Sequence, residues 1–182
     1  MICAIHQPNF VPWRPYFSKI EASDVFVLLT ECQFEKGGFQ NRFRHDGTWF
    51  TMPVSKGLVP IREKFYLDPT THWRQLKAKS KMAEKLSRFD SLIDESLLRT
   101  NSNIITEVLR LLGCTTEIVS DFPTSATRSE RLIEICRFYE ADTYLSGPSG
   151  RKYLDLDLFA KARIKVEYFS TTDNRSAIEF LP

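Results

Sequence analysis

The sequence predicts an α/β fold: a mostly parallel sheet in a Rossmann-like three-layer core, with an inserted β-hairpin and helices. Three observations favour this class. Short apolar runs alternate with an amphipathic stretch at the N-terminus, the same alternation returns in the last third, and the region between them has a different pattern. We expect a single domain over residues 1–182, with 31–113 as the insertion, because 182 residues is an ordinary size for one domain.

The N-terminal segment has the pattern of a strand–helix–strand unit. The apolar run over residues 2–5 is too short for a helix and predicts a buried strand. Helical spacing of apolar residues follows over 13–22, where Pro15 falls in the first turn and its missing N–H is tolerated. A second apolar run over 25–29 completes a βαβ unit, which implies parallel strands.

The rest of the chain is interpreted from the same kinds of pattern. Asp46-Gly47 between two β-prone runs predicts a hairpin. In the insertion, the expected helices cover 71–86, 90–98 and 103–112, and Gly113 ends the last of them. In the last third, the expected strands cover 115–119, 143–145 and 164–169, and the expected helices cover 130–139 and 156–162.

Charge is distributed unevenly along the chain. The formal net charge is +2, but residues 36–88 hold twelve Lys and Arg against four Asp and Glu. A basic middle indicates an anionic ligand such as a phosphate, a nucleotide or a nucleic acid, although a solvated surface gives the same pattern. Lys77 and Lys81, four residues apart on an expected helix, are candidates for a phosphate-binding stripe.

Composition narrows the cellular context. The longest apolar run is far shorter than the ~20 residues needed to cross a bilayer, and no basic leader precedes an apolar stretch. The four cysteines include no Cys-x-x-Cys pair, and the three histidines lie in unrelated segments. We therefore expect a cytoplasmic protein with reduced thiols, no membrane association and no metal site.

Polar loops follow the expected strands, at the edge where open parallel sheets bind ligands. His6, Gln7 and Asn9 are the candidate catalytic residues, because an imidazole can transfer a proton near neutral pH or donate to a phosphate. The structural alternative is a histidine satisfied by a backbone carbonyl. Gln33 follows the second strand, and Asn41 and Arg42 lie beyond a flexible Gly-Gly pair that could close over a ligand.

A glycine-bearing loop follows the strand over 143–145. It comprises Ser146, Gly147 and the residues up to Arg151, and its backbone N–H groups are able to face an anion with Arg151 as a clamp. The loop lacks the Gly-Lys-Ser/Thr ending of a Walker motif, and an ordinary tight turn is the alternative. Tyr153 beside it is a candidate for stacking on a base or a sugar. We assign all four residues to substrate or phosphate binding.

Two motifs resemble the WbqC-like protein family. The first is His6-Gln7-Pro8-Asn9-Phe10-Val11-Pro12-Trp13, and the second is Tyr144-Leu145-Ser146-Gly147-Pro148-Ser149-Gly150-Arg151. The resemblance continues through Gln33-Phe34 and Gln40-Asn41-Arg42, whereas Pro15 stands where the family pattern usually has glycine. It implies an association with O-antigen and other surface-polysaccharide gene clusters. The matching positions are His6, Gln7, Asn9, Gln33, Asn41, Arg42, Ser146, Gly147 and Arg151.

The leading hypothesis is a transferase. The family resemblance implies an acyl or aminoacyl (glycyl-type) group moved to a nucleotide-linked or phosphorylated amino sugar in lipopolysaccharide biosynthesis. The expected partner is a small molecule, ATP is the one candidate cofactor, and the oligomeric state stays open.

Two alternatives remain. The histidine loop before a helix resembles the HIGH-type nucleotidyltransferase and acyl-adenylate ligase superfamily, which implies ATP as a cofactor, although the second histidine of that motif is missing. The other alternative is a non-enzymatic nucleic-acid-binding or assembly module, which we do not favour because no nucleic-acid motif is present.

Overall fold

The computed structural model describes residues 1–181, without the side chain of Ile178. The chain divides into two compact units. The first unit comprises Met1–His6, Pro15–Leu29 and Thr115–Asp173. The second comprises Gln7–Arg14, Thr30–Cys114 and the segment from Asn174 onward. A single domain with an insertion over 31–113 stays a prediction.

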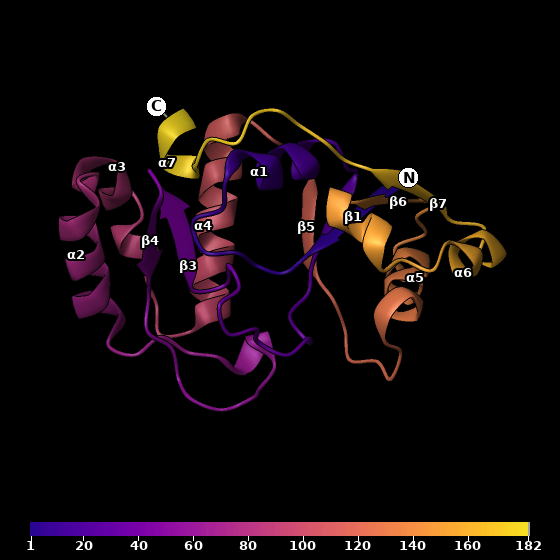
Figure 1. Cartoon of the computed structure of the whole chain (residues 1–182), viewed down its shortest axis with the longest axis horizontal. Helices are drawn as coiled ribbons and strands as arrows, with labels where there is room; N and C mark the ends of the chain where they lie inside the picture. The colour runs from indigo at the N-terminus through magenta and orange to yellow at the C-terminus, as the bar shows by residue number, and fades with distance from the viewer. Residues whose placement is uncertain (182) are drawn as a thin grey trace. The chain divides into compact units, whose positions relative to one another are not determined.

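A five-stranded parallel sheet forms the centre of the first unit, in the order β5-β2-β1-β6-β7 (Figure 1). Its strands are β1 (Ile2–His6), β2 (Val25–Leu28), β5 (Glu117–Ser120), β6 (Thr143–Ser146) and β7 (Lys165–Tyr168). Counted within the unit, this is the order of a doubly wound sheet, in which the chain proceeds from the first strand in both directions. The predicted α/β class with a mostly parallel sheet is confirmed.

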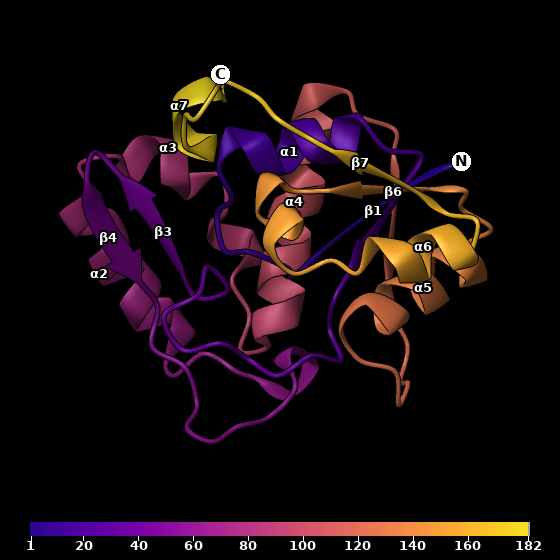
Figure 2. The ribbon, with the colours of Figure 1, turned by 45° about the vertical axis from the view of Figure 1, so that its right-hand side comes forward.

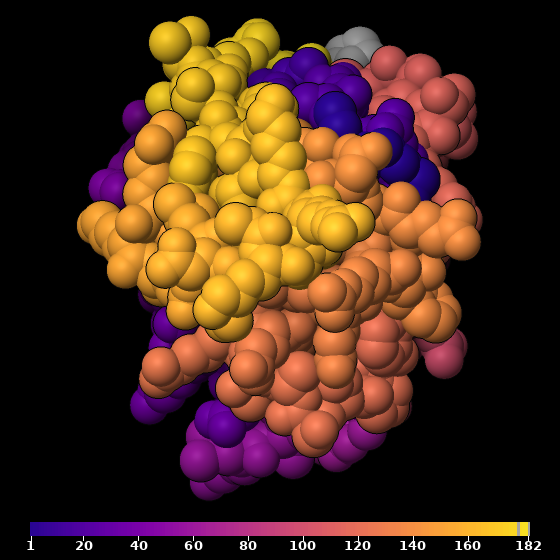
Figure 3. All heavy atoms as spheres, turned by 90° about the vertical axis from the view of Figure 1, so that its right-hand side faces the viewer, coloured from indigo at the N-terminus to yellow at the C-terminus, as the bar shows by residue number. Residues whose placement is uncertain are grey.

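Helices cover both faces of this sheet and give the three layers expected. They are α1 (Arg14–Glu21), α5 (Arg128–Phe138), α6 (Leu156–Lys161) and the 3₁₀ helix η3 (Pro148–Lys152). The apolar face of α5 and α6 packs on Cys3, Ile5 and Val27 of the strands. On the opposite face, the ring centre of Tyr16 in α1 lies 5.3 Å from that of Phe26. Figure 2 shows α1 on one side of the strands and α5 and α6 on the other, and Figure 3 views the surface formed by the segment from α5 to β7.

The second unit combines a hairpin with helices. The hairpin joins β3 (Arg42–His45) to β4 (Thr48–Thr51) through Asp46 and Gly47, which both have positive φ, as a two-residue turn requires. The helical elements are η1 (Ile61–Glu63), α2 (Pro69–Ser80), α3 (Ala83–Ser87), η2 (Asp90–Leu92), α4 (Leu97–Leu112) and α7 (Ala177–Phe180). The hairpin prediction is confirmed.

The predictions of two helices in this unit, over 71–86 and 90–98, are wrong. The helix over 71–86 is split, because Lys81 has φ 57° and its left-handed backbone ends α2. Of the expected helix over 90–98, residues 90–92 form a 3₁₀ turn, and α4 begins only at Leu97, where Ser96 Oγ accepts from Arg99 N at 3.2 Å. The left-handed Gly113 ends α4, as expected. The prediction that Lys77 and Lys81 form a phosphate-binding stripe is also wrong, since Lys81 lies outside the helix and Lys77 pairs with Asp90.

Lys19 is a charged side chain buried against the sheet of the first unit. It is 5% exposed, and its Nζ donates to the carbonyl oxygen of Ile5 at 2.9 Å. The centre of the Phe26 ring lies 6.0 Å from the same nitrogen. Burial lowers the pKa of Lys19 to about 8, because desolvation disfavours the charged ammonium. Folding therefore opposes protonation of this side chain.

We expect Lys19 to make the protein more stable as the pH rises from about 8, the pKa of Lys19 in the folded chain, to 10.5, the ordinary pKa of a solvated lysine. Below this window both states hold the proton. Inside it only the unfolded chain does, so the free energy of unfolding rises, by about 3 kcal/mol in all. Urea denaturation of the wild type and of Lys19→Met across this window measures the effect. A stability difference between the two chains that is independent of pH would contradict it.

Candidate functional site

In the parallel sheet of the first unit, the order in which the chain adds strands reverses between β1 and β6. Their pairing runs from Ile2 and Thr143 to Ala4 and Leu145, and beyond it the two strands lead into different segments of the chain. His6 is the last residue of β1, and Ser146 is the last residue of β6. Both therefore lie at the carboxyl edge of neighbouring parallel strands, at the switch point where open α/β sheets bind ligands.

The position of His6 is fixed by its neighbours in the same unit. Its carbonyl oxygen accepts a hydrogen bond from Leu29 N at 2.9 Å, which extends the ladder between β1 and β2. Its half-buried ring meets the ring of Tyr16 edge-on, with 5.1 Å between ring centres. Since Tyr16 belongs to α1, helix packing orients the imidazole at the strand end. This arrangement suits a proton carrier or a donor to an anion.

The loop after β6 is a tight 3₁₀ turn built around a buried serine. Ser146 is fully buried, its Oγ donates to the carbonyl oxygen of Gly147 at 3.1 Å, and its own carbonyl accepts from Phe169 N at 2.8 Å. Gly150 N donates to the carbonyl of Gly147 at 3.0 Å and closes the turn. Gly150 also lies so close to Ser146 that a Cβ there would overlap with Oγ. The backbone is thus held rigidly at the edge of the sheet.

Arg151 and Tyr153 are exposed at the end of this turn. The Arg151 guanidinium lies 4.1 Å from the centre of the Tyr168 ring, and Tyr168 is the last residue of β7. Desolvation, and then the neighbouring Tyr168, raise the pKa of Tyr153, so its phenol stays a donor at neutral pH. Arg151, Tyr153 and Tyr168 form a group at the carboxyl edge. Sequence reasoning missed Tyr168, although its place at a strand end was the available signal.

The other predicted site residues belong to the second unit. They are Gln7, Asn9, Gln33, Asn41 and Arg42. The structure therefore brings together His6, Ser146, Gly147, Arg151 and Tyr153 in one unit, and places these five in the other.

Gln7 lies in a network of amides. Its Nε2 donates to Cys32 Sγ at 3.4 Å, and its Oε1 accepts from Gln40 Nε2. Asn101 of α4 donates to the carbonyl oxygens of Pro8 at 2.8 Å and Gln40 at 2.7 Å. The network therefore joins the segment after β1 to the segment before β3 within the second unit.

Asn41 and Arg42 make contacts that hold the backbone. The buried Asn41 donates through Nδ2 to the carbonyl oxygen of Met52 at 2.7 Å. Arg42 donates to the carbonyl oxygens of Gly37 and Gly38, and its guanidinium lies 4.1 Å from the centre of the Trp49 ring. These contacts fix the loop over the glycine pair. Gln33 is exposed, and its backbone forms a bridge with Pro60.

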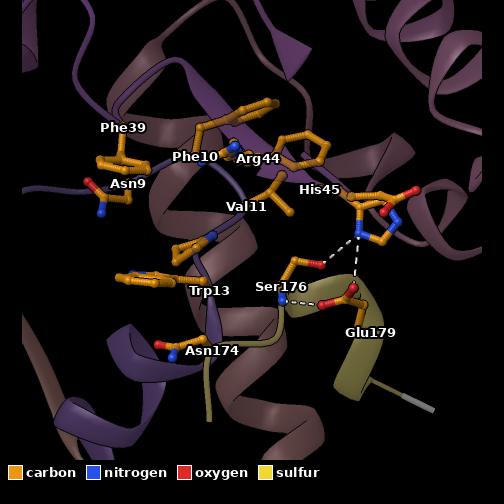
Figure 4. A pocket seen from close by; sticks show the side chains of 13 residues that line it. Asn9, Phe10, Val11, Trp13, Phe39, Arg44, His45, Asn174, Ser176 and Glu179 are labelled. Atoms are coloured by element: carbon orange, nitrogen blue, oxygen red, sulfur yellow. Dashed lines mark hydrogen bonds and ion pairs between the residues drawn. The ribbon is translucent and has the colours of Figure 1, made fainter. Parts of the chain in front are cut away.

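A pocket of about 260 Å³ lies in the second unit (Figure 4). Its walls are residues 9–13, residues 43–46 and Phe39, together with Asn174, Ser176 and Glu179. Of the predicted residues, only Asn9 lines it. Sequence reasoning missed the others, because their segments are far apart along the chain. The one local signal was the Ser-x-x-Glu pattern over 176–179, which predicts a helix cap and carries no information about a pocket.

His45, Ser176 and Glu179 meet on one side of this pocket (Figure 4). His45 Nδ1 lies 3.3 Å from Ser176 Oγ and 3.3 Å from Glu179 Oε1, while Glu179 Oε2 accepts from Ser176 N at 2.6 Å. A nucleophilic triad needs the serine and the carboxylate on different ring nitrogens. Here both face the same nitrogen, and Ser176 and Glu179 form the capping box of α7. The group holds the wall of the pocket rather than activating the serine.

Two other kinds of feature are absent from the described part of the chain. Within residues 1–181, no group of three His, Cys, Asp or Glu side chains is arranged to hold a metal ion. None of the helices in the same range is both long enough and apolar enough to span a membrane.

The fold and these motifs define a family. The sequence profile of the WbqC-like protein family matches residues 7–176, so the chain belongs to this family. It is also 30% identical, over 187 aligned residues, to the uncharacterized protein Rv1507c of Mycobacterium tuberculosis. That alignment covers 91% of this chain and 80% of the relative. No solved structure matches the chain.

The tight turn after β6 gives a test that compares two glycines. A Cβ at Gly150 would overlap with Ser146 Oγ and lie 3.0 Å from Leu154 Cδ1, whereas a Cβ at Gly147 meets no atom within 4 Å. We expect Gly150→Ala to lower the free energy of unfolding by about 1–3 kcal/mol, as overpacking does. Gly147→Ala should leave it within about 0.5 kcal/mol of the wild type. Equal stability of the two variants in urea denaturation would show that the close approach is absent.

Proposed function

We propose that this protein is a transferase that moves an acyl or aminoacyl group, of the glycyl type, to a nucleotide-linked or phosphorylated amino sugar in surface-polysaccharide biosynthesis. The observation that carries the proposal is the position of His6 and of the turn from Ser146 to Arg151 at the switch point of a doubly wound sheet. Nucleotides and other phosphate ligands bind such sheets at this edge.

Arg151 supplies the positive charge for the phosphate. Its guanidinium packs on the Tyr168 ring, and stacking of this kind engages the flat face of the group. The N–H donors in its plane are then directed sideways, where a phosphate can accept from two of them. Tyr153, 60% exposed in the same group, offers a ring and a phenol donor for the rest of the ligand.

His6 acts as the general base. The acceptor amine attacks the acyl carbon of the donor, and the imidazole takes the proton that the nitrogen loses as the new amide bond forms. The donor's leaving group departs with the electrons of the broken acyl bond. The edge contact with Tyr16 keeps the imidazole plane fixed during this step. A base whose orientation is fixed before the reaction lowers the barrier, because no further entropy is lost in positioning it.

An ATP-using nucleotidyltransferase or acyl-adenylate-forming enzyme is a second candidate. The observation that favours it is the same histidine, which ends the first strand and is followed by the segment that enters α1. In that chemistry His6 donates to a phosphate oxygen instead of accepting a proton. ATP would then be a substrate, and its effect on stability separates the two functions.

A nucleic-acid-binding role has less support. Several cations of the basic segment are engaged inside the second unit: Arg62 pairs with Glu31, and Lys77 pairs with Asp90. The buried Lys64 donates to two backbone carbonyls, at 2.6 and 2.7 Å. Ion pairs of this kind reduce the charge available to a phosphate backbone.

A ligand panel tests the proposed binding. We expect a nucleoside-diphosphate amino sugar at about 100 times its Kd to stabilise the wild type by about 2.7 kcal/mol in thermal denaturation. Arg151→Met should lose most of this stabilisation, while Arg163→Met, which removes another exposed arginine of the first unit, should keep it. Stabilisation by ATP alone would favour adenylate chemistry. If no nucleotide of either kind stabilises the protein, binding at this edge is wrong.

Turnover tests the role of His6. We expect His6→Ala to lower kcat by roughly 10²–10⁴, the usual contribution of a general base. His72→Ala is the matched control, since it removes a histidine of α2 that the mechanism does not use. Glycyl transfer to the amino sugar is followed by mass spectrometry of the product. A folded His6→Ala protein with unchanged kcat would exclude the histidine from catalysis.

A further inference from the structure

The pocket of the second unit contains an amide that the fold does not use. Asn9 is 4% exposed and lines the pocket. Within residues 1–181 its side-chain amide forms no hydrogen bond, and its atoms are not among those wholly cut off from solvent, so the amide is accessible from the pocket. In Figure 4 this amide is drawn on the same side of the pocket as Trp13 and Phe39. A donor and an acceptor held together inside a hollow are suited to a ligand that presents both.

Aromatic surface accompanies this amide. Trp13 is 46% exposed and Phe39 is 44% exposed, although both are large apolar side chains. The backbone of Trp13 is held by a bridge to Ser176, so the indole is placed at the pocket by a fixed segment. The Phe39 ring leans on Trp49, with 5.4 Å between ring centres. The pocket therefore presents at least one ring face that a flat apolar surface of a ligand can cover.

Charged side chains of both signs line the pocket. Arg44 is cationic, whereas Asp46 and Glu179 are anionic, and the amide of Asn174 adds a further donor and acceptor. Two carboxylates against one guanidinium do not favour a phosphate or another anion. The lining therefore suits a ligand that has no net negative charge and that donates and accepts hydrogen bonds on several sides.

We propose that this pocket binds a sugar ring, with one face of the ring packed on the Trp13 indole and neighbouring hydroxyl groups paired with the Asn9 amide. A sugar hydroxyl both donates and accepts, so hydroxyls around a ring can satisfy amide and carboxylate groups on several sides. A nucleobase has its polar groups in one plane and would leave several of these side chains unsatisfied. The volume of about 260 Å³ accommodates a single ring. The pocket belongs to the second unit, and sugar binding here uses none of the first-unit residues proposed for transfer.

Binding of simple glycosides to the full chain tests this site. The probes are the methyl glycosides of glucose, galactose and N-acetylglucosamine at millimolar concentration, with adenosine as the base-containing comparison. Saturation-transfer NMR and tryptophan fluorescence report binding. We expect at least one glycoside to bind, with its ring protons saturated and the indole emission changed, and we expect adenosine to leave the indole emission unchanged.

Three variants locate the site. Trp13→Ala should weaken glycoside binding at least about tenfold, the usual scale for removing a stacking ring. Asn9→Leu should abolish it while leaving the melting temperature close to that of the wild type, because within residues 1–181 the amide forms no hydrogen bond that the substitution would break. Phe65→Ala is the control, an exposed aromatic of the same unit outside this pocket, and should bind as the wild type does.

The outcomes separate the possibilities. If no glycoside binds the wild type, or if adenosine binds in place of the glycosides, the proposal is overturned. It is also overturned if Asn9→Leu folds and binds sugar with unchanged affinity. Because Asn9→Leu keeps the size of the side chain, it decides the question even where Trp13→Ala fails to fold. Loss of glycoside binding with unchanged nucleotide stabilisation would support this pocket while leaving the transferase proposal to its own tests.

Discussion

The first unit depends on the double pairing of β1, which has β2 on one side and β6 on the other. Cys3 and Ala4 are fully buried, so this strand is covered on both faces as well as both edges. A strand in this position cannot shift by one residue without exchanging its two faces, which fixes its register. That register in turn fixes where His6 emerges. The carboxyl edge of the sheet is therefore a consequence of core packing, and the chemistry proposed there requires no movement of the backbone.

In the second unit a buried hydrogen-bond network takes this organising role. Asn101 is fully buried and donates to two carbonyl oxygens, while its Oδ1 accepts from Tyr66 Oη at 2.9 Å. Burial raises the pKa of Tyr66, so the phenol remains a donor. One of the two carbonyls belongs to Pro8, next to the pocket residue Asn9, and Phe10 N donates to Phe39 O at 2.8 Å. This network thus supports the wall of the pocket that carries the Asn9 amide.

Much of the fold could be predicted, because its signals are local. Apolar runs predicted the strands, and Gly113 predicted the end of α4. The split between α2 and α3 could not be predicted, because Lys81 adopts a left-handed backbone that glycine normally marks. The pocket was missed for another reason: His45 and Ser176 are 131 residues apart, and no local pattern pairs them. For the candidate site, strand ends identified His6 and Ser146, but the stacking of Arg151 on Tyr168 depends on which strand lies next to β6, and the sequence leaves that order open.

The central claim is that the switch point between β1 and β6 is where a phosphorylated ligand binds. Amide NMR of the 21.2 kDa protein during titration with a nucleoside-diphosphate sugar tests it most directly. The account predicts the largest shifts at His6 and over Gly147–Arg151, with smaller ones at the end of β7. Shifts confined to the basic segment over 36–88, with none at the carboxyl edge of the sheet, would contradict it.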